Sequence, residues 1–131
     1  MILRGLALSL VMAATMAVTA AIACSCMRFP SAAAQLQRTD VMFIGRAVQT
    51  QNEGSRSTTQ FAVQRTIKGE VRSTQLVEHT VAPTGMCGVT AFQRGRTYTI
   101  LASRYEGRLH TGSCSQPQFP IEDYEAAMAT P

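Results

Sequence analysis

The 131-residue chain has no tryptophan, only three tyrosines and five phenylalanines, and few charged residues for its size. Nucleic acids are usually bound by a basic stripe with aromatic side chains interleaved, on which bases can stack. The net charge is +4, but the arginines that dominate it are scattered along the chain. The sequence therefore disfavours nucleic-acid binding.

Catalytic groups are equally scarce. No nucleophile stands with a base, and no glycine-rich phosphate loop is present. His79 and His110 have no Cys or Asp at metal-binding spacing, and each is expected to be a half-exposed strand residue. The remaining acidic candidates are isolated in turn or strand sequences, namely Asp40, Glu53, Glu70, Glu78 and Glu106. We therefore expect a binding protein rather than an enzyme, with no cofactor and no metal site built by this chain alone.

Residues 1–23 are typical of a secretory signal. Arg4 is their one charged residue, the rest is apolar and small, and Ala21 and Ala23 suit signal peptidase. A transmembrane anchor is less favoured, because the run is rich in Ala and Thr and ends in a cleavage site. Cleavage after Ala23 would make Cys24 the new N-terminus, in a secreted or periplasmic protein. A bacterial lipoprotein with an acylated Cys24 is the further alternative, although Ala21 stands where those signals usually carry leucine.

Residues 24–131 are long enough for one domain. Four cysteines in an exported chain imply two disulfides. Cys24 and Cys26 are too close to bond each other comfortably, because alternate residues of an extended strand point to opposite faces. Each is left to pair with Cys87 or Cys114, and both arrangements are open. Either one ties down an N-terminal segment of the kind that normally frays.

The hydrophobic pattern predicts five strands between two short helices. Ser31 is a candidate N-cap for a helix that ends near residue 39, and residues 121–128 have helical spacing. Gly45, within the first apolar strand, suggests a bulge. The predicted strands cover residues 41–48, 59–67, 74–81, 98–102 and 109–111. This pattern predicts an all-β domain, a partly open five-stranded Greek-key barrel of the OB-fold type with short flanking helices.

Several local sequences form a recognisable set: Cys24-Ser25-Cys26 followed by Pro30, the run 40–48, Lys68-Gly69, Cys87-Gly88, and the segment from Tyr98 to Cys114. Together they resemble the N-terminal, netrin-like domain of the tissue inhibitors of metalloproteinases. The resemblance spans nearly all of residues 24–131 and implies an OB-fold barrel. It also implies the disulfides Cys24–Cys87 and Cys26–Cys114. The third disulfide and the second, cysteine-rich domain of the animal inhibitors are missing from this sequence.

In that family, the amine and the carbonyl of the first cysteine chelate the catalytic zinc of the target protease. The resemblance therefore implies that Cys24 binds the partner's zinc through its backbone nitrogen and oxygen. It places Ser25 in the specificity pocket of the protease, and Cys26, Gly85 and Met86 on the same binding ridge. The implied function is a monomeric, secreted inhibitor of a zinc metalloendopeptidase, with no membrane contact unless Cys24 is lipidated. The alternative is a netrin-like binding module, secreted or lipid-anchored, without inhibitory activity.

Overall fold

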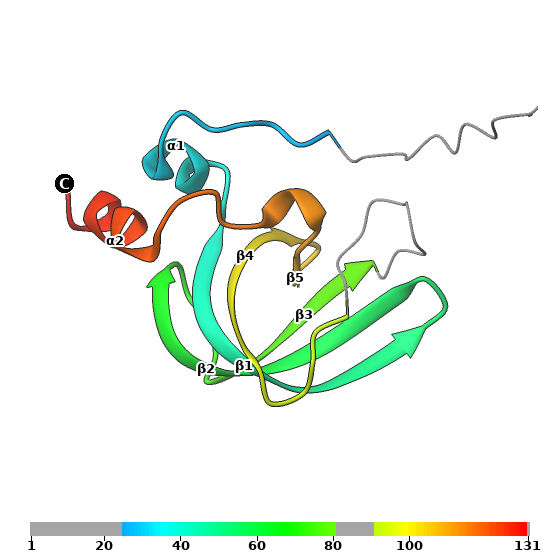
Figure 1. Ribbon diagram of the computed structural model, residues 1–131. Coiled ribbons are helices and arrows are strands. Elements are labelled where there is room, and N and C mark those ends of the chain that lie inside the picture. The colour runs from blue at the N-terminus through cyan, green and yellow to red at the C-terminus, as the bar shows by residue number, and fades with distance from the viewer. Residues whose placement is uncertain (1–24, 81–90, 131) are drawn as a thin grey trace, which may run out of the picture.

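The computed structural model describes residues 25–80 and 91–130, and these form a mainly β structure. Figure 1 shows the strands curling around one another into a small barrel, with the two α-helices side by side at one end. In chain order the elements are α1 (Ala32–Gln37), β1 (Val41–Glu53), β2 (Arg56–Lys68), β3 (Thr74–Thr80), β4 (Thr97–Tyr105), β5 (Arg108–His110), the 3-10 helix η1 (Ser113–Ser115) and α2 (Ile121–Ala129).

The five strands close into a ring in the order β1-β2-β3-β5-β4. β1 pairs antiparallel with β2 along its length and with β4 from Val41 to Arg46, and β3 runs parallel to β5. The five strands and two short helices confirm the expected set of elements, but the ring is closed where a partly open barrel was expected. It closes because β1, thirteen residues long, borders both β2 and β4. The register of β1 shifts between Ile44 and Gly45, which confirms the predicted bulge.

The hydrophobic core has two parts, which lie on opposite faces of the sheet. The first fills the barrel and contains Phe43, Phe61, Val77, Ile100 and Leu109 among others. The second lies between the barrel and the helices and consists of Ala32, Leu36, Met42, Leu101 and Tyr124. Both faces are buried at the start of β1, since Phe43 faces the barrel interior and Met42 lies under the helices. The two helices therefore sit on an apolar outer face of the sheet.

The end of α1 is fixed to the end of β2. Ser31 caps the start of α1 as predicted, accepting a hydrogen bond from the Ala34 amide at 3.1 Å. At the other end, the Lys68 ammonium donates to the carbonyl oxygens of Leu36 and Thr39. A cation suits this position because the carbonyls at the C-terminal end of a helix carry partial negative charge. Lys68 thus anchors the helix that follows the N-terminal segment.

Three strands extend further than the sequence predicts, since β4 continues to Tyr105 and both strands of the β1–β2 hairpin are longer than expected. β1 continues to Glu53 and β2 begins at Arg56, so the turn between them is only two residues long. The added residues, 49–53, are polar and mostly exposed. They offer no apolar alternation, and this part of the hairpin is held by its backbone ladder instead.

His79 is buried, contrary to the expectation that both histidines are half-exposed; only 3% of its surface is accessible. It shares the inner face of β3 with Val77, because residues two apart on a strand point the same way. Its Nε2 lies 2.7 Å from Thr59 Oγ1, and its ring packs edge-on against Phe92. Within the described residues, its Nδ1 has no hydrogen-bond partner. Burial lowers the pKa of His79 below its usual value.

Candidate functional site

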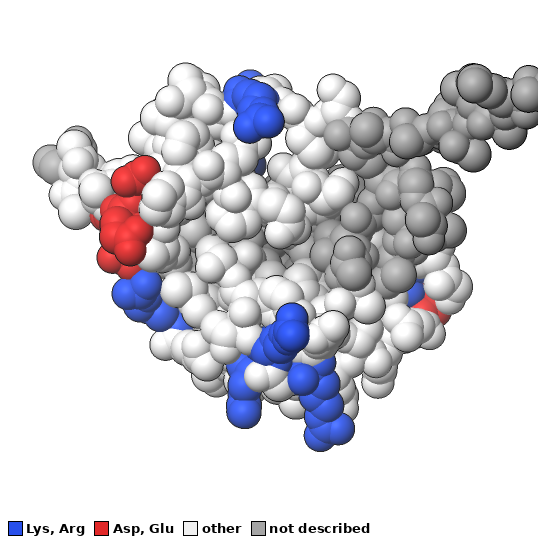
Figure 2. Space-filling view, viewed as in Figure 1, with Lys and Arg blue, Asp and Glu red and all other residues white. Residues whose placement is uncertain are grey.

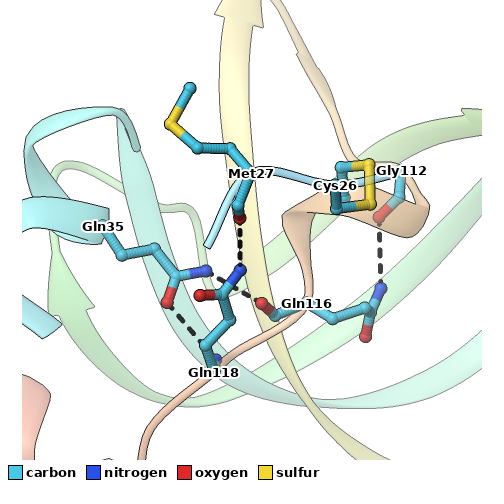
Figure 3. Close-up of a disulfide and its surroundings, with 7 residues drawn as sticks. Cys26, Met27, Gln35, Gly112, Gln116 and Gln118 are labelled. Atoms are coloured by element: carbon cyan, nitrogen blue, oxygen red, sulfur yellow. Dashed lines mark hydrogen bonds between the residues drawn. A yellow bond between two sulfur atoms is a disulfide. The ribbon is translucent and has the colours of Figure 1, made fainter. Parts of the chain in front are cut away.

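The N-terminal segment, residues 25–30, is bonded covalently to the C-terminal part of the domain. Cys26 and Cys114 form a disulfide across a sequence separation of 88 residues, with their Cα atoms 5.2 Å apart. This is one of the two pairs implied by the resemblance to the metalloproteinase inhibitors. On the chain-entropy model, a bond that closes so long a loop stabilises the fold by about 4 kcal/mol. The disulfide fixes the segment against η1, as Figure 3 shows.

The side chain of Gln118 holds the same segment a few residues further on. Its Nε2 donates to the Met27 carbonyl oxygen at 2.8 Å, and its Oε1 accepts from the Phe29 amide at 2.9 Å. Figure 3 shows the first of these bonds. A single side-chain amide thus satisfies one acceptor and one donor of an extended backbone, as a neighbouring strand would. Residues 26–29 are therefore fixed at three points, namely the disulfide and the two hydrogen bonds.

Gln118 is itself positioned by two buried side chains, Gln35 of α1 and Tyr124 of α2. The Gln118 backbone amide donates to Tyr124 Oη at 3.0 Å and to Gln35 Oε1 at 3.3 Å. Tyr124 Oη donates to Gln35 Oε1 in turn, and Gln35 Nε2 donates to the Gln116 carbonyl at 2.8 Å. Gln35 is 2% exposed and Tyr124 is fully buried. A buried polar network with every member paired is rigid, so it holds Gln118 in one place.

The segment presents small, apolar and charged side chains to solvent, the charged one being Arg28. Ser25 is exposed, Met27 is 61% exposed, and Cys26 is half-buried by its bond. Phe29 faces the domain instead and lines a cavity of about 140 Å³ together with Cys114. The segment can therefore contact a partner through the exposed side chains of Ser25, Met27 and Arg28, while Cys26 and Phe29 face the domain.

The structure describes only part of the predicted site. Ser25 and Cys26 lie in the segment, whereas Cys24, Gly85, Met86 and the expected bond of Cys24 to Cys87 lie outside the described residues, as does the expected cleavage after residue 23. Sequence analysis missed the role of Gln118. The only hint in the sequence is its place four residues after a cysteine, in a stretch with two glutamines around a proline.

Glu78 is not isolated, contrary to expectation. Its Oε1 accepts from Arg108 at 2.8 Å, and its Oε2 lies 3.3 Å from His110 Nδ1. The hydrogen bond from Arg108 lowers the pKa of Glu78, and the nearby charges of Arg108, His110 and Arg56 act in the same direction against its desolvation. The carboxylate is therefore held ionised. The sequence could not reveal the cluster, because β3 and β5 become neighbours only in the closed ring.

No protein-family model matches the chain, and no curated protein matches it. Among residues 25–80 and 91–130, no three His, Cys, Asp or Glu side chains gather where they could hold a metal ion. The part of the chain that the structure describes also contains no helix long and apolar enough to cross a membrane. Figure 2 shows acidic side chains gathered over α2 and basic side chains in several separate places on this face.

Proposed function

We propose that this protein is a secreted inhibitor of a zinc metalloendopeptidase, and that it acts through the backbone amine and carbonyl of Cys24 after cleavage of residues 1–23. The observation that supports this is the fixing of residues 26–29 by the Cys26–Cys114 disulfide and by Gln118. Terminal segments usually fray, and this one is held although it fills none of the barrel core. A chain end held in this way is suited to enter another protein's cleft.

The proposed chemistry needs no cofactor and no catalytic group from this chain. A catalytic zinc is held by three protein ligands and keeps a fourth position for an exchangeable water. An α-amine and the carbonyl of the same residue form a bidentate ligand that can displace this water. Binding costs little ordering entropy when the ligand is already rigid. Cys24 is two residues before Cys26, so even a fully extended chain places it no more than about 7 Å from the residue that the disulfide fixes.

The fold supports the same proposal. We assign the ring to the Greek-key OB-fold type, because its strand order is 1-2-3-5-4 and its β3–β5 pairing is parallel. With Cys26 and Cys114 bonded, Cys24 and Cys87 are the two cysteines left to pair. Exposed Ser25 would enter the specificity pocket of the protease, and Gly85 and Met86 would flank the same ridge.

The test is inhibition by mature protein of a panel of zinc endopeptidases with His₃ and His₂Glu metal sites. Two variants are compared: one with a single alanine added before Cys24, and a matched control with the alanine added after Pro131. We expect the N-terminal addition to abolish inhibition, because it removes the free amine from Cys24, and the C-terminal addition to have no effect. Equal inhibition by all three proteins would refute zinc chelation, and no inhibition of any protease by the unmodified protein would refute the proposed function.

The intact mass of the protein, purified after expression with its own residues 1–23, is the companion measurement. A mass equal to residues 24–131 less four hydrogens is expected for a free amine and two disulfides. A mass higher by hundreds of daltons would identify an acylated Cys24. That result would favour the alternative, a lipid-anchored binding module, because an acylated amine cannot chelate zinc.

A further inference from the structure

The cavity behind Phe29 is a second candidate binding site, separate from the exposed side chains of the N-terminal segment. It has a volume of about 140 Å³ and lies between the segment, the end of α1, one end of β4 and η1. An engineered protein cavity of about 150 Å³ holds benzene, so a space of this size suits a ligand of about four to six non-hydrogen atoms. The lining includes Phe29, Gln35, Arg38, Ser103, Cys114 and Ser115.

Hydrogen-bonding groups reach this cavity from three elements. Ser103 shares the outer face of β4 with Leu101, which packs under α1, because residues two apart on a strand point the same way. Ser115 comes from η1, and Gln35, which is 2% exposed, comes from α1. The side-chain nitrogen of Gln35 carries two N–H groups, and one of them donates to the Gln116 carbonyl. The two hydroxyls and the second N–H of Gln35 are therefore donors for a ligand.

The charge of the lining selects an anion. Of the described residues that line the cavity, Arg38 alone is charged. It is the C-cap residue of α1, its side chain is exposed, and it forms no ion pair within residues 25–80 and 91–130. The planar guanidinium matches a carboxylate or a phosphate group through two parallel hydrogen bonds. No carboxylate in the lining competes with a bound anion for Arg38.

The size and the apolar part of the lining restrict the anion further. The ring of Phe29 and the sulfur of Cys114, which is bonded to Cys26, form an apolar part of the wall. Inorganic phosphate has no apolar group to place against them. A dicarboxylate would bring a second charge into a space where Arg38 is the only cation, and a buried charge without a partner is costly. A single carboxylate with a short hydrocarbon chain matches both parts of the wall.

We propose that this cavity binds a free short-chain monocarboxylate of the size of acetate to butyrate. Its carboxylate accepts hydrogen bonds from Arg38 and from the two serine hydroxyls, and its hydrocarbon part packs against Phe29 and the disulfide. Phe29 belongs to the N-terminal segment, whereas the other groups belong to the domain. The ligand therefore binds the docked segment and not the released one, so it stabilises the docked form by linkage. The proposal does not depend on zinc chelation by Cys24, and its test measures no inhibition.

The test is a titration of the mature, disulfide-bonded protein with acetate, propionate and butyrate, followed by amide NMR shifts at an ionic strength held constant with sodium chloride. Propionamide, which has nearly the shape of propionate without its charge, and inorganic phosphate are the comparisons. We expect at least one carboxylate at millimolar concentration to shift the amides of Phe29, Ser103 and Ser115. At about ten times its dissociation constant it should slow hydrogen exchange of the Phe29 amide about 10-fold.

Three results of this titration would overturn the proposal. They are no shift with any of the three carboxylates, shifts confined to other parts of the domain, and shifts of equal size with propionamide or phosphate.

Two variants tie the binding to the cavity. Arg38→Gln removes the charge and should weaken the affinity about 10-fold or more, which is the loss of one hydrogen bond to a charged group. Ser103→Val fills part of the cavity with a side chain that suits a strand, and it should weaken binding as well. Arg46→Gln is the matched control, because Arg46 is exposed on β1 and lies outside the lining. Unchanged affinity in either Arg38→Gln or Ser103→Val, or an equal loss in Arg46→Gln, would overturn the assignment of the cavity.

Discussion

Replacing Gln118 by alanine tests whether one side chain orders the N-terminal segment. The substitution removes both hydrogen bonds between Gln118 and the segment, the one to the Met27 carbonyl and the one from the Phe29 amide. It leaves the backbone amide of residue 118 bonded to Tyr124 and Gln35, and it leaves the Cys26–Cys114 disulfide intact. The change is therefore confined to the contact between Gln118 and residues 27–29.

The magnitude follows from the two lost bonds. A hydrogen bond contributes about 0.5–1.5 kcal/mol net. The freed Met27 carbonyl belongs to a residue that is 61% exposed and can be hydrated, so its bond lies at the low end of this range. Phe29 is half-buried, and its amide is costlier to leave unpaired. We expect a loss of about 1–2 kcal/mol, which raises the opened population of the segment about 5–30-fold. The global free energy of unfolding falls by no more than this amount.

The assay is amide hydrogen exchange followed by NMR, read at Phe29. Protection of this amide should fall about 5–30-fold in Gln118→Ala and by less in Gln118→Glu, since a carboxylate still accepts from Phe29 but cannot donate to Met27. Gln116→Ala is the matched control, because the side chain of Gln116 bonds to the Gly112 carbonyl instead. Unchanged exchange at Phe29 in Gln118→Ala, or an equal loss of protection in Gln116→Ala, would refute the reasoning.

Three further predictions concern the rest of the domain. The free energy of unfolding should fall as the pH is lowered from neutral toward the lowered pKa of His79, because below about pH 6.5 the unfolded chain takes up a proton that the buried ring resists. The slope is at most about 1.4 kcal/mol per pH unit. Urea titrations at stepped pH measure this slope, and the His79→Gln variant, which does not titrate, should flatten it. Tyr124→Phe should lower the free energy of unfolding, measured in urea, by about 1–3 kcal/mol, because it removes a buried hydroxyl that bonds to Gln35 and to two backbone amides. A smaller decrease would show that the network is not tightly packed. Gly69→Ala should lower the melting temperature more than Gly54→Ala. Both glycines have positive φ, but a Cβ at Gly69 would lie 2.5 Å from a backbone oxygen, whereas a Cβ at Gly54 would meet open space. Equal effects of the two substitutions would contradict this steric argument.

The sequence predicted those features well that depend on contacts between residues close together in the chain. Ser31 predicts the start of α1 because capping depends on the next three residues. Gly45 predicts the bulge because a glycine within an apolar strand often marks an irregularity in the strand pairing. The absence of a side chain is needed here, because a Cβ at this position would lie only 3.0 Å from the Phe43 ring. The extended hairpin of β1 and β2 was underestimated, because its polar residues 49–53 show no alternation that a sequence can reveal.

The exposure of individual side chains was harder to predict, because it depends on which strands become neighbours. The burial of His79 could have been predicted from the alternation of β3, because alternate residues of a strand face the same side and Val77 faces the barrel interior. The surroundings of Glu78 carry no such signal. Its partners Arg108 and His110 are 30 or more residues away in the sequence and reach it only through the pairing of β3 with β5. The order of the ring must be known before this cluster can be predicted.

The order of the N-terminal segment depends in the same way on the complete fold. Its disulfide and its hydrogen bonds all join residues 26–29 to residues 114–118, across separations of 88 to 91 residues. Contacts of such long separation form only after the entropy of closing the loop has been offset by other contacts, here those of the barrel and of α2 with α1. The positioning network also draws Gln35 from α1 and Tyr124 from α2, so it exists only when both helices are docked. Any change that undocks α2 should therefore loosen the contacts of Gln118 with residues 27–29, even when it lies far from Cys26, and leave the Cys26–Cys114 disulfide as their tether. The rigidity of this segment is thus a property of the whole domain and not of its own six residues.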